Sequence, residues 1–152
     1  MTRQVFVGDV AIGGDAPVSI QSMSNIDTKN VQEVLRQIDE MRDAGCQIMR
    51  LAVPDIEAAS AFGQIKEKSS LPLVADIHFD YRLAIIAMEN GADKIRLNPG
   101  NIGGKENIKK VVDVAKERKI PIRIGVNSGS LERDILRKYG GVTARGMVES
   151  AQ

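Results

Sequence analysis

Short apolar runs alternate with helical patterns along most of the chain. Five runs have the length and composition of buried strands, at 18–23, 47–53, 72–79, 93–98 and 121–127. The stretches between them place apolar residues three and four apart, as in Val31, Val34 and Ile38. A strict order of strand and helix predicts an α/β fold with parallel strands.

The predicted helices begin and end at recognisable residues. Asn30 and Glu33 have the spacing of a capping box ahead of the first helix. Gly45 and Gly91 follow two helices at the position where a left-handed residue is favoured. The fourth helix is expected to start near Glu106, after the loop Gly100–Gly104, which we interpret as flexible first and as a phosphate cradle second.

Alternation within the strands distinguishes two kinds of parallel sheet. One face of each strand carries apolar residues for helices, such as Ile95 and Leu97, or Ile122 and Ile124. The other face carries polar residues, and a doubly wound sheet would need both faces apolar. The pattern therefore predicts a (β/α)8 TIM barrel with a polar lumen, of which residues 1–152 supply about five βα units.

Composition adds little but excludes several classes of protein. With 152 residues and 43% hydrophobic residues, one compact domain is expected. The net charge of +1 argues against nucleic acid or a membrane as partner. No stretch resembles a signal peptide or a membrane span, and the single cysteine, Cys46, suits the reducing cytoplasm. We expect Cys46 to be a packing residue and no metal to be bound within residues 1–152.

The polar face indicates an anion site at the carboxyl ends of the strands. Barrel enzymes build their sites at that end, and arginine binds phosphate at two points without losing its charge. We expect substrate binding by seven residues: Arg50, Asp76, His78, Arg96, Asn98, Arg123 and Asn127. The structural alternative is an arginine that pairs with Asp76, and it stays open for any one of the three arginines.

Five blocks then resemble the 4-hydroxy-3-methylbut-2-enyl diphosphate synthase family. They are QSMSN (21–25), AGCQIMRLAVPD (44–55), PLVADIHFDYRLA (72–84), DKIRLNPGNIG (93–103) and PIRIGVNSGSLE (121–132). The resemblance implies an iron-sulfur oxidoreductase of the methylerythritol phosphate route to isoprenoids. That enzyme reductively opens 2-C-methyl-D-erythritol 2,4-cyclodiphosphate, with ferredoxin or flavodoxin as electron donor.

The resemblance also implies which parts of the activity to expect here. Arg50, Arg96 and Arg123 match the arginines that bind the diphosphate, and Asp76, Asn98 and Asn127 match other polar residues of the pocket. The acid/base residue and the ligands of the [4Fe-4S] cluster belong to later parts of the family. We therefore expect an N-terminal fragment of the barrel domain that lacks the C-terminal iron-sulfur domain, has no catalytic residue and is inactive alone.

Departures from the family pattern and rival functions complete these expectations. Ser24 and Ile26 replace usual threonines, and TARGMVESA (143–151) lacks an expected proline and glutamate, which weakens the expected helix cap there. A pterin-binding barrel of the dihydropteroate synthase type and a non-enzymatic phosphoester-binding module remain alternatives. An unfinished barrel exposes two strand edges, so we expect a homodimer or other self-association, or a final helix, around Met147 and Val148, that covers an edge.

Overall fold

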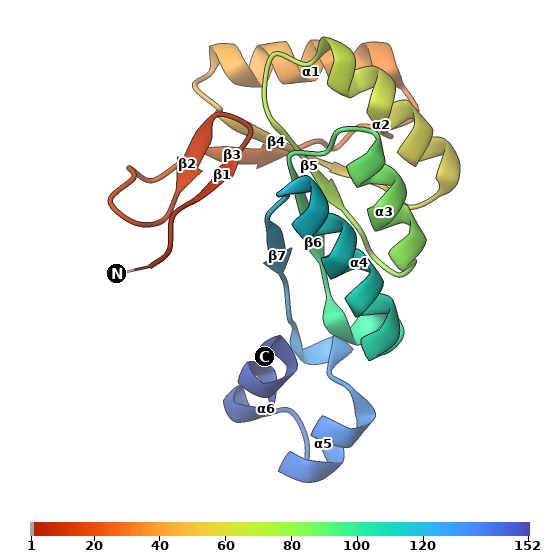
Figure 1. Ribbon diagram of the computed structural model, residues 1–152. Coiled ribbons are helices and arrows are strands. Elements are labelled where there is room, and N and C mark those ends of the chain that lie inside the picture. The colour runs from red at the N-terminus through yellow and green to blue at the C-terminus, as the bar shows by residue number, and fades with distance from the viewer. Residues whose placement is uncertain (1) are drawn as a thin grey trace.

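A computed structural model describes residues 2–152, and its centre is a curved parallel sheet (Figure 1). The sheet has five strands in the order β3-β4-β5-β6-β7, and every neighbouring pair is parallel. The strands are β3 (Gln21–Met23), β4 (Ile48–Ala52), β5 (Leu73–Asp76), β6 (Lys94–Leu97) and β7 (Ile122–Ile124). Strand order equals chain order, so the predicted partial TIM barrel with five parallel βα units is confirmed.

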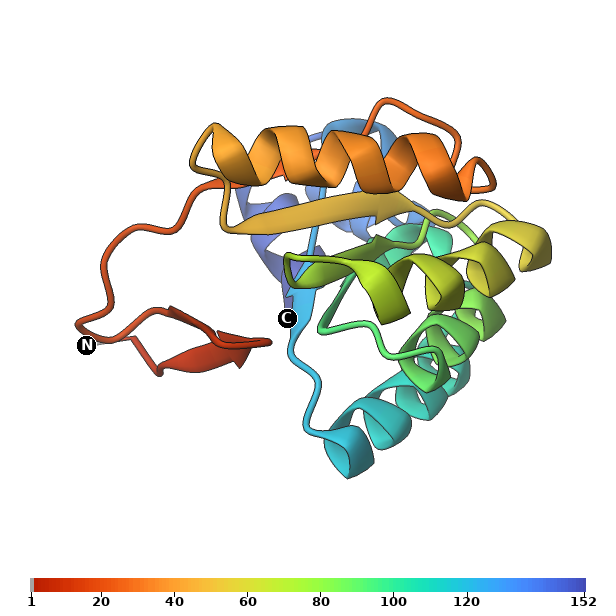
Figure 2. The same cartoon turned by 90° about the horizontal axis from the view of Figure 1, so that it is seen from above.

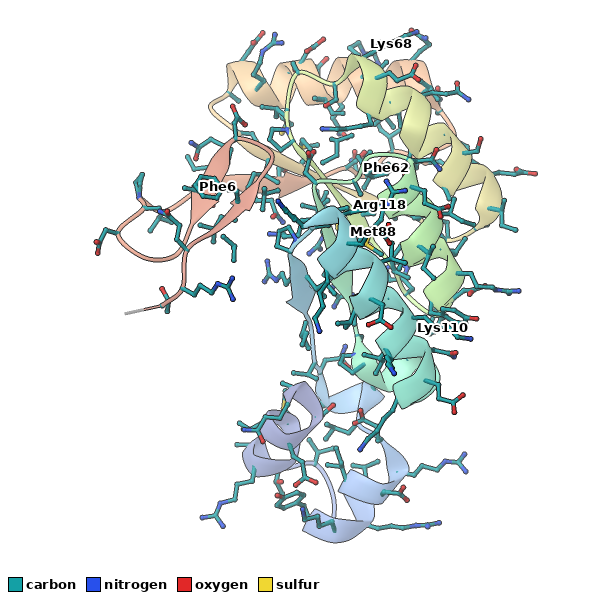
Figure 3. The ribbon with its side chains drawn as sticks, viewed as in Figure 1. Phe6, Phe62, Lys68, Met88, Lys110 and Arg118 are labelled. Carbon is teal, nitrogen blue, oxygen red and sulfur yellow. The ribbon has the colours of Figure 1, made fainter. Side chains whose placement is uncertain are left out.

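Four helices lie on the convex face of this sheet (Figure 2). They are α1 (Val31–Asp43), α2 (Ile56–Lys68), α3 (Tyr81–Glu89) and α4 (Lys105–Arg118). Their apolar faces meet Leu51, Ala75 and Ile95 of the sheet in one continuous core, where Phe62 and Met88 (Figure 3) are buried. The predicted separation into a helix face and a lumen face is thus correct for the central strands.

The helix ends follow the sequence in part. Gly45 and Gly91 have φ of +95° and +88°, as expected for residues that follow a helix. The capping box at Asn30 is wrong, because its side chain makes no cap hydrogen bond and ψ is 72°. The backbone N–H of Asn30 instead donates to the carbonyl of Asp27, in a turn that precedes α1.

The N-terminal hairpin is an element that the periodicity analysis missed. It joins β1 (Val5–Val7) and β2 (Val10–Ile12) through Gly8 and Asp9, and Gly8 has φ of +59°. Val7 packs against Ile48 and Val74, two lumen-face residues near the amino ends of their strands. The hairpin therefore covers the amino end of the lumen, where Gln21 and Lys94 begin β3 and β6, and Asp76 and Arg96 lie nearer the carboxyl end.

The residues after β7 form a small helical unit past the end of that strand (Figure 1). It contains η2 (Ser128–Ser130), α5 (Arg133–Tyr139) and α6 (Ala144–Ala151), and η1 (Pro99–Asn101), in the loop after β6, is tied to it by the Asn98–Ser130 hydrogen bond. The hydroxyl of Thr143 accepts a hydrogen bond from the Gly146 N–H at 3.0 Å, so the cap that the sequence placed in doubt does form. Because α5 and α6 lie beyond β7, Ile124 is 49% exposed, and its predicted burial against helices is wrong.

Candidate anion site at the carboxyl end of the sheet

Strand register brings the predicted cationic residues together on the concave face. Asp76 pairs in register with Arg96, and Arg96 pairs with Arg123 on the next strand. Arg50 lies on β4 in the preceding row, opposite Met23 and Val74. Side chains in register on neighbouring strands project to the same face, so three arginines and one carboxylate line one end of the lumen.

Asp76 is the shared partner of three of the predicted residues. Its carboxylate is 3% exposed and accepts a hydrogen bond from Arg96 Nη1 at 3.1 Å. Arg50 Nε lies 3.5 Å from the other carboxylate oxygen, and His78 Nε2 lies 3.6 Å from that same oxygen. Arg50 and Arg96 therefore do contact Asp76, as the structural alternative supposed, and this pairing does not decide whether they also bind a ligand.

Two further cations lack such a partner and leave the site electropositive. Among residues 2–152, neither Arg123 nor Lys94 has a carboxylate oxygen within 4.0 Å. Lys94 is 7% exposed, and its Nζ lies 3.5 Å from Gln21 Oε1. Burial lowers the pKa of Lys94, and the nearby charges of Arg123 and Arg50 lower it further.

Lys94 is a site residue that the sequence analysis overlooked. It shares the period-two face of Arg96 and Asn98 in KIRLN, so the signal was present in the same strand. With Lys94 included, the lumen face carries four cations and one carboxylate, that of Asp76. Such an imbalance in a half-buried site favours a multiply charged anion as ligand.

Asn98 and Asn127 shape the loops that border the site. Asn98 is 1% exposed; its Oδ1 accepts from the Gly100 N–H at 3.1 Å and its Nδ2 donates to Ser130 Oγ at 2.5 Å. Asn127 Oδ1 accepts from the Gly129 N–H at 3.1 Å. Each asparagine caps a short 3₁₀ turn, η1 or η2, and the Asn98–Ser130 bond ties the two turns together.

The loop predicted to be flexible is tightly fitted at its first glycine. A Cβ on Gly100 would collide with the carbonyl oxygen of Ser130. Gly103 and Gly104 have φ of +83° and +87°, and Gly104 is the N-cap of α4. The loop is therefore closely packed at Gly100, and its backbone needs glycine where it turns into α4.

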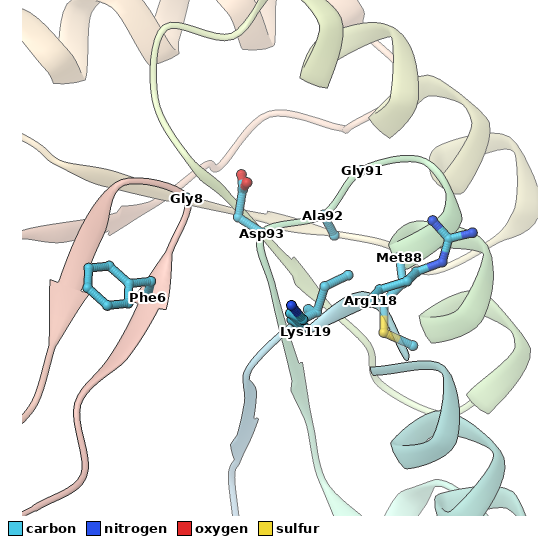
Figure 4. Close-up of a pocket in the computed structure, with 9 residues that line it drawn as sticks. Phe6, Gly8, Met88, Gly91, Ala92, Asp93, Arg118 and Lys119 are labelled. Carbon is cyan, nitrogen blue, oxygen red and sulfur yellow. The ribbon is translucent and has the colours of Figure 1, made fainter. Parts of the chain in front are cut away.

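A cavity extends from this site toward the hairpin. Its volume is about 410 Å³, and Gln21, Lys94 and Arg123 border it together with Val5 and Ile12. A second hollow lies at the opposite end of the strands, where Phe6, Asp93 and Lys119 line it (Figure 4). Asp93 already binds Lys66 Nζ at 2.6 Å and the Leu73 N–H at 2.7 Å, so this second hollow offers no free carboxylate.

The residues of this chain do not fit an iron-sulfur cluster. The sequence has one cysteine, and Cys46 is buried with its thiol donating to the carbonyl of Ile48 at 3.1 Å. Within residues 2–152, no group of three or more His, Cys, Asp or Glu side chains is arranged to hold a metal ion. Over the same residues, no helix has both the length and the hydropathy to cross a bilayer.

Comparison with known proteins decides the family. The model of the GcpE TIM-barrel domain matches residues 2–152. The chain belongs to this family. It is 61% identical over 150 residues to 4-hydroxy-3-methylbut-2-en-1-yl diphosphate synthase (flavodoxin) of Ruminiclostridium cellulolyticum and 60% identical over 151 residues to the protein of that name from Caldanaerobacter subterraneus.

These relatives are longer proteins. Each alignment covers 99% of this chain and 42% of the relative, so this chain spans less than half the length of either relative. A dihydropteroate synthase of Xanthomonas albilineans resembles the structure with a TM-score of 0.58 over 97% of this chain and 57% of its own, at 12% identity. That likeness concerns the fold, and the family match does not favour the pterin-binding alternative.

Proposed function

We propose that this chain supplies the diphosphate-binding part of a 4-hydroxy-3-methylbut-2-en-1-yl diphosphate synthase. The observation that carries the proposal is the excess of cations over carboxylates on the lumen face of the half-barrel. Arg50, Lys94, Arg96 and Arg123 face Asp76 alone, and two of them lack any acidic partner in the described residues. The names of the family relatives state a diphosphate as product.

The cyclic diphosphate of methylerythritol is the proposed substrate. Arg123 is exposed and without a carboxylate partner, so its whole fork is available for phosphate oxygens. Arg96 presents the Nε/Nη2 edge that Asp76 leaves free, whereas Nε and Nη2 of Arg50 lie 3.2 Å and 2.9 Å from Met23 Sδ, so Arg50 offers mainly Nη1. Asp76 holds these two forks in a fixed orientation before the ligand arrives, which lowers the entropic cost of binding.

His78 lies at the border of the proposed binding site. Its side chain is 40% exposed, and Nε2 lies toward Asp76 while the ring tilts against Phe79. We assign it to substrate binding at the mouth of the site. Asn98 and Asn127 contribute by fixing the loops around the ligand, and the free amide nitrogen of Asn127 can donate to a phosphate oxygen.

We propose the reductive step for longer proteins of this family, such as the two relatives named above. A [4Fe-4S] cluster would supply electrons there, with flavodoxin or ferredoxin as donor in the cytoplasm. The cysteine content of residues 1–152 provides no site for that cluster. What this chain contributes is the position and charge that bind a diphosphate and stabilise negative charge in the reaction.

Thermal protection tests the proposal against the pterin alternative. The melting temperature of the chain is measured with the cyclic diphosphate, with inorganic diphosphate and with a dihydropterin. A ligand that binds only the native state raises the melting temperature by an amount that grows with the ratio of its concentration to its dissociation constant. We expect both diphosphates to protect; protection by the pterin alone would reverse the assignment.

A further inference from the structure

Gly125 lies directly against the guanidinium of Arg96. It follows β7, and its N–H donates to the Leu97 carbonyl at 2.8 Å, which continues the pairing of β7 with β6. A Cβ built on Gly125 would lie 2.7 Å from Arg96 Nη2, 2.8 Å from Nε and 3.0 Å from Cζ. Real Cβ atoms do not approach other heavy atoms to 2.7 Å, so any side chain at 125 would displace the guanidinium or the backbone.

The backbone conformation does not explain this glycine. Positive φ occurs at nine glycines, among them Gly8 and Gly45, and Gly125 is not one of them. The φ of Gly125 is outside the left-handed region that favours glycine, and the tight contacts of an added Cβ are all with Arg96.

The edge of Arg96 that borders Gly125 is the edge that Asp76 does not use. Asp76 accepts from Nη1, whereas the missing Cβ would approach Nε and Nη2. Nε and Nη2 carry two parallel N–H groups, the pair that binds a carboxylate or phosphate side-on. The Nε/Nη2 edge is therefore a two-point donor that Asp76 leaves unused, and a methyl group at position 125 would cover it.

We propose that Gly125 is a positioning residue, which keeps the Nε/Nη2 edge of Arg96 open for a phosphate group of the substrate. Asp76 fixes the guanidinium through Nη1, and the bare backbone at Gly125 leaves the second edge accessible. The inference rests on the proposed diphosphate-binding function and adds a residue whose contribution is the absence of a side chain.

A double-mutant cycle tests the role of Gly125. The affinity of the chain for inorganic diphosphate is measured by calorimetry for wild type, Gly125→Ala, Arg96→Lys and the double variant. We expect Gly125→Ala and Arg96→Lys each to weaken binding about tenfold or more, because each loses the two-point contact. The double variant should bind no more weakly than Arg96→Lys, since lysine has no such edge to cover.

Gly129→Ala is the matched control, because a Cβ there makes an ordinary 3.6 Å contact and φ is not positive. It should bind as wild type. If Gly125→Ala unfolds the chain, the double variant with Arg96→Lys decides the matter. If the double variant folds, the unfolding came from a clash with the Arg96 guanidinium; if it also stays unfolded, that clash is refuted. Wild-type affinity in Gly125→Ala, or losses of affinity that add up in the double variant, would refute the role of Gly125 and leave the proposed function standing. Absence of binding by wild type would refute the proposed function and this inference together.

Discussion

Replacing Asp76 with asparagine should destabilise the chain while strengthening its response to anions. The substitution keeps the shape of the side chain but removes the one negative charge among four cations. Asp76 is 3% exposed, and it accepts from Arg96 at 3.1 Å and lies 3.5 Å from Arg50. Without that carboxylate the two guanidiniums repel each other and the nearby Lys94.

The structure sets the size of this effect. A hydrogen bond to a charged group contributes about 1.5–3 kcal/mol, and breaking a fully buried ion pair costs about 3–5 kcal/mol. The side chains of Arg50 and Arg96 are 26% and 22% exposed, so water compensates part of the loss. We expect about 2 kcal/mol, which lowers the melting temperature by roughly 4–8 °C for a chain of this size.

Calorimetric melting with and without inorganic diphosphate provides the assay. Asp113→Asn is the control, because Asp113 is exposed on α4 and should change the melting temperature little. Diphosphate should raise the melting temperature of Asp76→Asn more than that of wild type, since it replaces the lost negative charge. An unchanged melting temperature in Asp76→Asn, or an equal fall in Asp113→Asn, would refute the central place of Asp76.

Three other predictions follow from the same structure. Lys94→Met should raise the free energy of unfolding by about 1 kcal/mol or more at pH 7, as measured by denaturation. Because burial lowers the pKa of Lys94 in the folded state, this gain in stability should shrink as the pH rises from that pKa to 10.5. A gain that grows with pH would contradict the prediction. The purified chain should be colourless and without reductive activity, and visible absorbance lost on mutation of Cys46 would overturn this. Sedimentation should show concentration-dependent association through the edges of β3 and β7, where Ile20 and Ile124 are 59% and 49% exposed; a monomer at all concentrations would refute it.

Periodicity was sufficient to predict the sheet but not the hairpin. The central strands carry strict alternation, so the helix-facing residues Leu51, Ala75 and Ile95 could be predicted individually. The hairpin strands, VFV and VAI, contain no polar residue, so they show no alternation of polar and apolar positions. Its contacts with Ile48 and Val74 are distant in sequence, and local patterns carry no information about them.

The composition of the site could be predicted more completely than its geometry. Period and strand position identified Arg50, Asp76, Arg96 and Arg123 as one group, and register confirms that they share the lumen face. Which arginine pairs with Asp76 depends on side-chain rotamers and on distances between strands. The steric role of Gly125 depends on where the Arg96 guanidinium lies, and a sequence does not contain that information.

The Asn residues illustrate a further limit. Asn98 and Asn127 stand where pocket residues are expected, yet their side chains first close short turns with Gly100 and Gly129. An asparagine followed two residues later by glycine is a recognised turn pattern. A role in closing the turn therefore competes with a role in binding the ligand. Only the observed hydrogen bonds show which atoms of each amide are already used.

Nuclear magnetic resonance tests most directly whether the carboxyl end of the sheet binds diphosphate. Inorganic diphosphate is titrated into isotopically labelled chain, and the backbone and arginine Nε signals are followed. We predict saturable shifts at the Arg96 and Arg123 signals and in the loops after β6 and β7. Shifts confined to the opposite end, around Phe6 and Lys119, or no saturable shift at all, would contradict the account.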